Sequence, residues 1–433
     1  MNPAGQQRAR IREIVEGCLR SAIPPEALLP PDDIDWIESG LLDSMAHVEV
    51  LICMERAIGS PNLFDRSGIA PPATIQLAIE AIEAIEAIES LPQHSLHSVP
   101  ETKSWGQHST GRAGLLGWGA AFGSRHLTPA QVEREFNMPM GDLGRRAGLE
   151  RLCRAPGDED EISLAKAAAE KALELAGVHA QSLSWIIGTS ETVLGFPSFA
   201  ALLDTALLAS GNCRVLDVGG GCVGLLNALV VADALFADVR VENILVVSAD
   251  VHSRVLVPGK VPGELGGLFG DGASAFLFQR SDEEAASTRY SIRTSIGSCL
   301  GTYSAALKVR PSLDAGIAVE FDGESLAHAV ADRMERIISD LEMASGVPRE
   351  AAIGFALHQP NPRLTRILLQ RARLPLEKVP LIAASYGNLG ASTCGAALSA
   401  ILDLHAAKPG IIRGPVFMAA VAPGLLWAGA VLA

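Results

Sequence analysis

The spacing of apolar residues divides the chain into an N-terminal part with helical periodicity and a longer part in which short apolar runs alternate with helices. The stretch DSMAHVEVLICMERAIG, residues 43–59, has the pattern of an amphipathic helix with Asp43 or Ser44 as its N-cap. Two further segments have helical features: residues 6–20 in the spacing of their apolar positions, and residues 71–90 in their opening prolines. These features predict an all-α bundle over residues 1–90.

The second part begins after a segment without periodicity. Residues 91–111 are rich in Ser, Pro and His and are predicted to be a linker. From residue 112 onward, apolar runs such as SWIIGTS and NILVVSAD alternate with helices rich in alanine and leucine. This alternation predicts an α/β domain of buried, largely parallel strands covered by helices over residues 112–433, in halves of about 112–285 and 286–433.

The last 18 residues, 416–433, contain no charge and have the length of a marginal membrane span. The dipeptide Pro423-Gly424 stands in the middle of this stretch and is a turn signal. We therefore predict two buried strands joined by a turn, and no membrane association.

Composition and charge narrow the class of protein. Of the 433 residues 48% are hydrophobic and 19% are charged, which indicates a well-filled core. Residues 1–95 hold 15 acidic and 6 basic side chains, a net of −9 out of −14 for the whole chain. The absence of a basic patch argues against nucleic-acid binding, and the acidic block suggests a separate module that meets basic surfaces.

The cysteine pattern and the N-terminal sequence indicate the cellular compartment of the protein. Seven scattered cysteines without a CxxC pair are typical of reduced thiols in a cytosolic protein. No apolar segment follows the arginines near the N-terminus, so a signal peptide is not expected. We predict a cytoplasmic protein.

The stretch LDVGGGCVGLL, residues 216–226, places a cysteine directly after three glycines. A buried strand is predicted before it and a helix after it, so Cys222 stands at a strand-to-helix turn that the glycines allow to be sharp. The helix N-terminus is expected to lower the pKa of the thiol and favour a nucleophile. A buried structural cysteine is the alternative interpretation.

Two candidate partners for this thiol follow later in the chain. His358, in GFALHQPNPRL, is predicted at the end of a strand, where α/β active sites gather. Asn388 lies in SYGNLGASTCGAAL, a glycine-rich turn before a helix of small residues. A histidine satisfied within the core and an ordinary left-handed turn residue are the alternatives for these two positions.

Taken together, these motifs resemble the ketoacyl synthase III branch of the thiolase superfamily from about Leu115 to Ala433. The cysteine at the elbow, the motif FGDGASA at 269–275, the histidine in an HQxN context and the asparagine in a GN turn occur in the family's order. The resemblance implies a thiolase fold, that is, two duplicated mixed-sheet halves in αβαβα layers. It also implies a homodimer.

The same resemblance assigns roles to individual residues. Cys222 would accept the acyl group, while His358 and Asn388 would bind and decarboxylate a malonyl-type thioester. Phe196 would reach into the partner's acyl pocket, and Arg363 would contact a carrier or coenzyme A. No metal is implied.

One loop departs from the family's pattern. Where the family has a run of glycines before a tryptophan, this chain has VAPGLLW, with Pro423 in the middle. Proline has no N–H to contribute to an oxyanion hole. Either Gly424 donates instead, or acyl transfer to Cys222 relies on fewer donors.

The segment ESGLLDSMAHVEVLICMERAIG, residues 38–59, resembles the acyl carrier protein signature. This resemblance implies a four-helix carrier bundle in which Ser44 bears 4′-phosphopantetheine, added by a phosphopantetheinyl transferase. A serine at a helix N-terminus also suits a phosphodiester. A plain helix cap at Asp43-Ser44 is the alternative, and methionine after the serine is a mild departure.

The sequence as a whole predicts a carrier fused to an acyltransferase of the β-ketoacyl synthase III type in fatty acid or polyketide biosynthesis. Its substrates would be acyl-CoA or acyl-carrier thioesters, condensed decarboxylatively to a β-ketoacyl product. An acyltransferase of the same fold that serves an alcohol or amine acceptor is the alternative. A non-catalytic partner subunit is a third interpretation, which the presence of Cys222, His358 and Asn388 disfavours.

Overall fold

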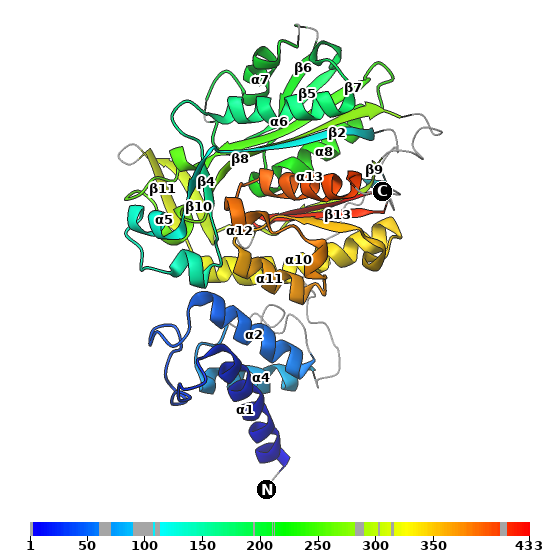
Figure 1. Ribbon diagram of the computed structural model, residues 1–433. Helices are drawn as coiled ribbons and strands as arrows, with labels where there is room; N and C mark the ends of the chain where they lie inside the picture. The colour runs from blue at the N-terminus through cyan, green and yellow to red at the C-terminus, as the bar shows by residue number, and fades with distance from the viewer. Residues whose placement is uncertain are drawn as a thin grey trace. The chain divides into compact units, whose positions relative to one another are not determined.

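The protein is described by a computed structural model that divides into two compact units (Figure 1). Unit 1 comprises Met1–Lys103 and Gly323–Asp332, and unit 2 comprises Ser104–Asp322 and Arg333–Ala433. The structure describes residues 3–59, 71–89, 107–108, 113–193, 195–209, 211, 213–281, 290–301, 304–312, 316–407 and 414–433. Except for residues 107–108, the predicted linker lies outside this part of the chain.

The N-terminal segment of unit 1, Met1–Lys103, contains three described helices. These are α1 (Pro3–Ala22), α2 (Ser44–Ile58) and α4 (Ile75–Glu89). Their apolar faces meet in one core that includes the fully buried Trp36. Asp43 is the N-cap of α2 and accepts the Ala46 N–H at 2.7 Å, so Ser44 is the first helical residue. A fourth helix of the predicted bundle is not among the described residues.

A disulfide joins two of these helices and corrects the prediction that all cysteines are reduced. Cys18 on α1 and Cys53 on α2 are bonded, with their Cα atoms 5.5 Å apart. The two helices pack against each other, and this packing brings together residues that are 35 positions apart in the chain. No cysteine motif in the sequence predicts this disulfide. The other five cysteines are free.

Unit 2 is built on a mixed sheet that consists of two similar halves. The strands of the first half, in spatial order, are β2 (Ala113–Phe122), β8 (Asp271–Arg280), β7 (Asn243–Val251), β5 (Trp185–Thr189) and β6 (Arg214–Asp217). Those of the second half are β9 (Tyr290–Cys299), β14 (Leu426–Leu432), β13 (Val416–Ala422) and β12 (Gly354–Leu357), with β1 (Gln107–His108) also paired to β9. The halves meet where β2 pairs with β9 at two positions.

Both halves repeat one sequence of strand directions. Starting from β2 or from β9, the first two neighbouring pairs are antiparallel and the third is parallel. The prediction of two duplicated mixed-sheet halves is therefore confirmed. The expectation of largely parallel strands is wrong, because among the described strand pairs of this sheet only β5–β6, β5–β7 and β12–β13 are parallel.

Helices cover the sheet halves in the predicted five-layer αβαβα order (Figure 1). The outer helices of the first half are α6 (Glu161–Ala176) and α7 (Phe199–Leu207), while α10 (Gly323–Ser345) and α11 (Pro362–Arg371) belong to the second half. The middle layer is formed by α8 (Gly224–Leu235) and α13 (Ser392–Ala406), which contact strands of both halves. Because these two helices have sheet on either side, small and apolar residues such as Ala228, Ala396 and Ala397 fill the interface.

The remaining elements are short. They are β3 (Arg125–Leu127), β4 (Leu152–Arg154), α5 (Pro129–Glu135), α9 (Gly263–Gly266), α12 (Ile382–Tyr386) and the hairpin β10 (Leu307–Ser312) and β11 (Gly316–Phe321). The C-terminal stretch forms the antiparallel strands β13 and β14 around Pro423-Gly424, as predicted. None of the helices in the described part of the chain has the length and apolar character needed to cross a membrane.

Candidate active site

Cys222 lies at the predicted strand-to-helix elbow. Gly220 and Gly221 have φ of 136° and 59°, values that favour glycine, and a single 3₁₀ turn (Gly221–Val223) leads into α8. A Cβ on Gly224 would overlap Thr189 at the end of β5, so glycine is needed where α8 begins. The elbow therefore holds Cys222 at the carboxyl end of the parallel strands.

The strand before the elbow differs from the prediction of a buried strand. All four residues of β6 are exposed, because β6 is the edge strand of the sheet in a single chain. Its apolar residues Val215 and Leu216 are 37% and 38% exposed.

The expected lowering of the thiol pKa is also wrong. Burial, together with the negative charges of Glu191 and Asp250 and a hydrogen bond to Glu191, raises the pKa of Cys222 well above its ordinary value. The hydrogen bond from the backbone at the elbow acts in the opposite direction but is outweighed. Cys222 is therefore a thiol at neutral pH and needs a proton acceptor in order to react.

His358 follows directly after β12, as predicted, and its backbone N–H donates to Ala419 at 2.9 Å. The side chain is buried, and its Nδ1 has no hydrogen-bond partner among the described residues. Burial lowers the pKa of His358 to about 4. The imidazole is therefore neutral at pH 7 and can act as a hydrogen-bond donor to a developing oxyanion.

Asn388 lies in the turn between α12 and α13. Its backbone N–H donates to Leu268 and its carbonyl oxygen accepts from Gly270, both at 2.9 Å. The side-chain Oδ1 accepts the Gly390 N–H at 3.0 Å and the Thr393 hydroxyl at 3.3 Å. Because these bonds occupy Oδ1, the amide nitrogen is the group left to donate to a substrate.

Gly390 brings the candidate residues into one site. Its backbone hydrogen-bonds to His358 as well as to Asn388. A Cβ on Gly390 would lie 2.7 Å from Cε1 of His252 and 2.9 Å from Oδ2 of Asp250. Since Cys222 interacts with Glu191 and Asp250, the thiol, the imidazole and the amide converge from both halves of unit 2.

Three residues without an assigned role from the sequence also lie in this site. Asp250, on β7, accepts the Glu191 N–H at 2.6 Å, and His252 Nε2 lies 3.8 Å from Glu191 Oε2. From the sequence alone they could line a pocket, but they received no role because nothing in their spacing marks a site. A usable signal was present, since they follow or end the adjacent parallel strands β5 and β7, where α/β sites form.

The charges of this cluster are interdependent. Burial raises the pKa of Asp250 to about 7. Burial lowers the pKa of His252, but the hydrogen bond to Glu191 and the charge of Asp250 outweigh it and raise the pKa to about 9. Burial raises the pKa of Glu191, but His252 outweighs it, so the net shift is downward. The cluster therefore contains an ionised Glu191 beside a protonated His252 at neutral pH.

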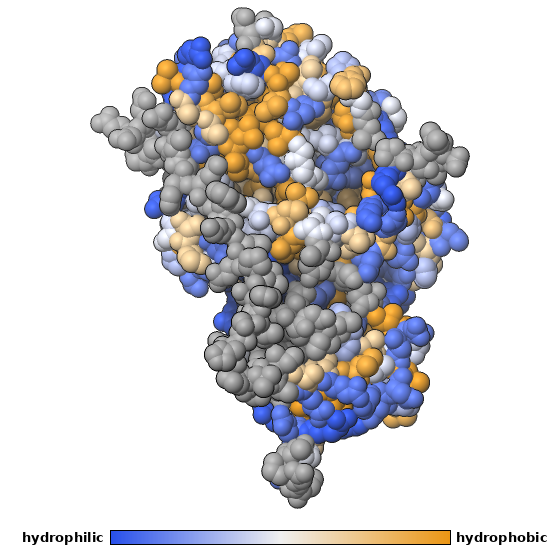
Figure 2. Space-filling view, turned by 180° about the vertical axis from the view of Figure 1, so that it is seen from behind, coloured by the Kyte–Doolittle hydropathy of each residue, from blue (hydrophilic) through white to orange (hydrophobic). Residues whose placement is uncertain are grey.

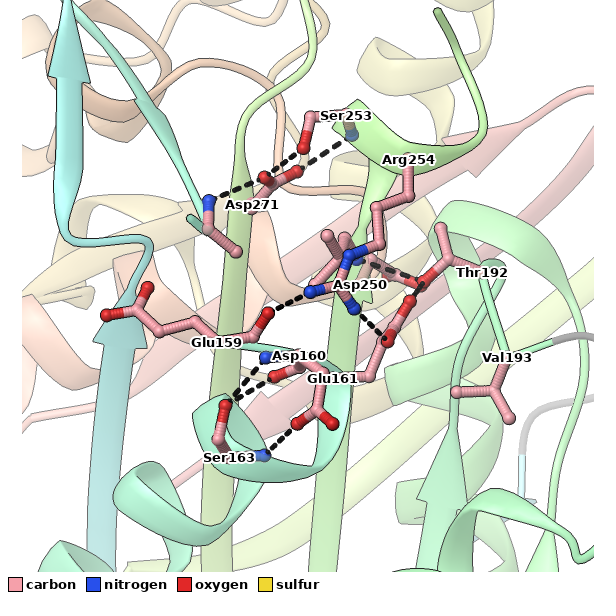
Figure 3. A network of polar contacts seen from close by, with 12 residues as sticks. Glu159, Asp160, Glu161, Ser163, Thr192, Val193, Asp250, Ser253, Arg254 and Asp271 are labelled. Atoms are coloured by element: carbon pink, nitrogen blue, oxygen red, sulfur yellow. Dashed lines mark hydrogen bonds and ion pairs between the residues drawn. The ribbon is translucent and has the colours of Figure 1, made fainter. Parts of the chain in front are cut away.

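A second polar network fixes the loops that carry this cluster (Figure 3). Thr192 donates to Glu161 at 2.7 Å and accepts the Val251 N–H at 2.9 Å, which ties the segment after β5 to the end of β7. Asp271, from the FGDGASA motif, accepts from the backbone and hydroxyl of Ser253 at 3.0 and 2.6 Å. The motif thus has a structural role in holding the turn that contains His252.

The substrate-binding candidates differ in their surroundings. Phe196 is fully exposed in the single chain. Arg363 is partly buried in the first turn of α11, and its backbone N–H donates to Ala147 at 3.0 Å. Gly424 has φ of 121° in the β13–β14 turn, and Ala422 of the same connection approaches Gly221 at the elbow. Ser44 begins α2 in unit 1, where its side chain lies outside the description.

The residues that could hold a metal or cofactor are few. Ligand atoms of Glu191, Asp250 and His252 lie within 4.8 Å of one another, a spacing that a divalent cation can bridge. The same three groups also neutralise one another as a protonated imidazole between two acids. No metal was predicted.

The duplicated αβαβα fold, with a cysteine at its elbow and a histidine and an asparagine from the second half, agrees with the resemblance to the ketoacyl synthase III branch of the thiolase superfamily. Comparison with known proteins agrees. The family profile 3-Oxoacyl-[acyl-carrier-protein (ACP)] synthase III matches residues 216–295, and the profile of its C-terminal region matches residues 343–433. Unit 2 is thus a ketosynthase III-like domain.

Individual relatives support the same assignment. The chain is 29% identical over 322 residues to the beta-ketoacyl-[acyl-carrier-protein] synthase III of Serratia proteamaculans, covering 73% of this chain and 98% of the relative. The crystal structure of 3-oxoacyl-[acyl-carrier-protein] synthase III from Aquifex aeolicus matches with a TM-score of 0.65 and 25% identity, over 74% of this chain and 99% of that one. The priming beta-ketosynthase of the R1128 polyketide pathway has the same fold, with a TM-score of 0.65 at 24% identity over 74% and 96% of the two chains.

Proposed function

We propose that the protein is an acyl-thioester condensing enzyme of fatty acid or polyketide biosynthesis with a fused carrier. An acyl group is transferred from coenzyme A or a carrier to Cys222. A malonyl-type thioester is then decarboxylated, and its enolate attacks the acyl group to give a β-ketoacyl product. The observation that carries this proposal is the convergence of Cys222, His358 and Asn388 through Gly390 and the Glu191 cluster.

The states of these groups suit the two steps. Loss of carbon dioxide leaves an enolate, which neutral donors stabilise without changing the net charge of the site. His358 is neutral because its pKa lies near 4, and Asn388 retains its amide donor. Simple acyl transfer to an alcohol or amine has less use for that amide, so condensation is favoured over this alternative.

The oxyanion of the acyl-transfer step also needs donors. Pro423 has no N–H, but the next residue, Gly424, has one, and no backbone carbonyl of the described residues accepts it. The turn that contains it follows Ala422, which approaches the elbow. We assign Gly424 as the donor that replaces the family's glycine at position 423.

A carrier role for unit 1 rests on α2. Ser44 begins this helix directly after the Asp43 cap, where the positive end of the helix dipole favours a phosphodiester. The acidic excess of residues 1–95 suits basic partner surfaces, among them a phosphopantetheinyl transferase. A tethered carrier would have an effective concentration on the order of millimolar toward its own enzyme.

The exposed edge of the sheet supports a homodimer through unit 2. Apolar side chains gather in the upper part of unit 2 in Figure 2, the part in which Figure 1 places β5, β6 and α7. The exposed apolar residues in and beside these elements include Phe196, Leu208, Val215 and Leu216. An unpaired edge strand with apolar side chains is a site for pairing with a second copy.

The test is mass spectrometry of peptides after co-expression with a phosphopantetheinyl transferase. Short acyl-CoA esters and malonyl-CoA are supplied separately to wild type, Cys222→Ala and Ser44→Ala. We expect acylation of the Cys222 peptide, pantetheine on the Ser44 peptide and carbon dioxide release from malonyl-CoA. Acylation without decarboxylation would support transfer to an alcohol or amine, and no adduct on Cys222 would refute the mechanism.

A further inference from the structure

The carboxylate of Glu191 lies against the backbone that presents the nucleophile. A Cβ added to Gly221 would be 3.7 Å from Glu191 Oε1, so this oxygen faces the residue directly before Cys222. Oε1 is buried and has no N–H or O–H donor among the described residues. An unsatisfied carboxylate oxygen in such a place is costly unless it serves the reaction.

The position of this carboxylate is fixed from two sides. The Glu191 N–H donates to Asp250 at 2.6 Å, and the Ser190 hydroxyl donates to the same oxygen at 3.2 Å. The second carboxylate oxygen, Oε2, lies 3.8 Å from His252 Nε2. One oxygen thus faces the imidazole of His252, and the other is left for the thiol.

Four titratable groups interact with Glu191, and their charges make it the acceptor for the thiol proton. They are Cys222, Asp250, His252 and His358. Cys222 is buried and protonated, so it cannot attack as a free thiolate at neutral pH to any large extent. His358 is hydrogen-bonded to the backbone of Gly390 and no hydrogen bond links it to the thiol, whereas Glu191 is ionised and interacts with the thiol directly.

We propose that Glu191 is the general base and acid of the acyl-transfer step, a catalytic role that rests on the proposed function. As Cys222 Sγ forms its bond to the thioester carbonyl carbon, the S–H proton moves to Glu191 Oε1. When the tetrahedral intermediate collapses and the carbon–sulfur bond of the donor breaks, the departing sulfur takes that proton from Glu191. The products are the acyl-enzyme and a neutral thiol, and Glu191 returns to its ionised state.

The test compares the rate of Cys222 acylation by an acyl-CoA in wild type, Glu191→Gln and Glu191→Asp, by rapid quench and intact mass between about pH 6 and 8.5. In Glu191→Gln only the free thiolate reacts, so we expect a rate at pH 7 about 10²–10⁴-fold below wild type. Because the thiolate fraction rises with pH, the ratio of the wild-type rate to the Glu191→Gln rate should fall about tenfold per pH unit. Asp250 also titrates in this range, and Glu191→Gln removes a charge that raises the pKa of Asp250, so Glu191→Asp, which keeps that charge, is the reference for this effect.

The variants separate catalysis from structure. Glu191→Asp keeps a base at a longer distance, so it should be slower than wild type but should follow the wild-type pH profile. Glu170→Gln removes an exposed carboxylate on α6 and should leave rate and profile unchanged. If both Glu191 variants have the wild-type profile at a lower rate, Glu191 is only structural and the inference is overturned. If wild type itself is not acylated by any donor, the proposed function fails, and this inference with it.

Discussion

Removing the bond between Cys18 and Cys53 should destabilise unit 1 selectively. The bonded residues are 35 positions apart, and closing a loop of that length lowers the entropy of the unfolded chain by an amount worth about 3–4 kcal/mol at 25 °C. A domain of this size has a total stability of about 5–15 kcal/mol. The loss is therefore a large fraction of the stability of unit 1, and corresponds to a fall in melting temperature of roughly 15–30 °C.

The assay is thermal unfolding of wild type and Cys18→Ser, with hydrogen exchange read on peptides from α1, α2 and α4 for unit 1 and from α6, α8 and α13 for unit 2. Only the unit 1 peptides should lose protection in the variant. Cys213→Ser, which removes a free thiol from unit 2, is the matched control and should leave unit 1 unchanged. The reasoning fails if alkylation of the denatured, unreduced protein labels all seven cysteines, or if Cys18→Ser melts like wild type.

Three further predictions concern unit 2. His358 should stay neutral down to about pH 4, so the rate of decarboxylation should fall only as the pH approaches 4. A pH–rate profile with its midpoint near the ordinary histidine pKa of 6.5 would contradict the burial argument. Gly395→Ala should destabilise unit 2 by about 1–3 kcal/mol in thermal unfolding, because the new Cβ on α13 would lie 2.6 Å from Ser274 Cβ on β8. An unchanged melting temperature would show that α13 and β8 can move apart. Val215→Lys combined with Leu216→Lys should give a monomer in light scattering, whereas a persistent dimer would place the interface elsewhere.

The structural features that depend on a short stretch of residues were predicted well from the sequence. The elbow at Cys222, the position of His358 after a strand and the turn at Asn388 each depend on a short run of residues with a clear preference. The two strands of the uncharged C-terminal stretch were predicted in the same way, because the dipeptide Pro423-Gly424 is a turn signal. The two-half organisation followed from the family resemblance, and strand pairing confirms it.

Features that depend on which elements become neighbours were not predicted. The Cys18–Cys53 bond requires α1 and α2 to pack in one register. The exposure of β6 reflects its place at the edge of the sheet, which an apolar run does not reveal. The thiol pKa was predicted with the wrong sign because the helix end is visible in the sequence, whereas burial and the carboxylates of Glu191 and Asp250 are not.

The depth of the reacting groups has a consequence for selectivity. Cys222, His358 and Asn388 are only 7%, 3% and 5% exposed. Cys222 and Asn388 lie just before the middle-layer helices α8 and α13, and His358 follows β12. Under the proposed function, a folded carrier protein is too bulky to reach these groups, and only a thin, flexible arm could deliver the acyl group. Substrate selection would then have two separate stages. The outer surface would select which donor docks, and the buried site would discriminate only among the acyl groups at the end of the arm.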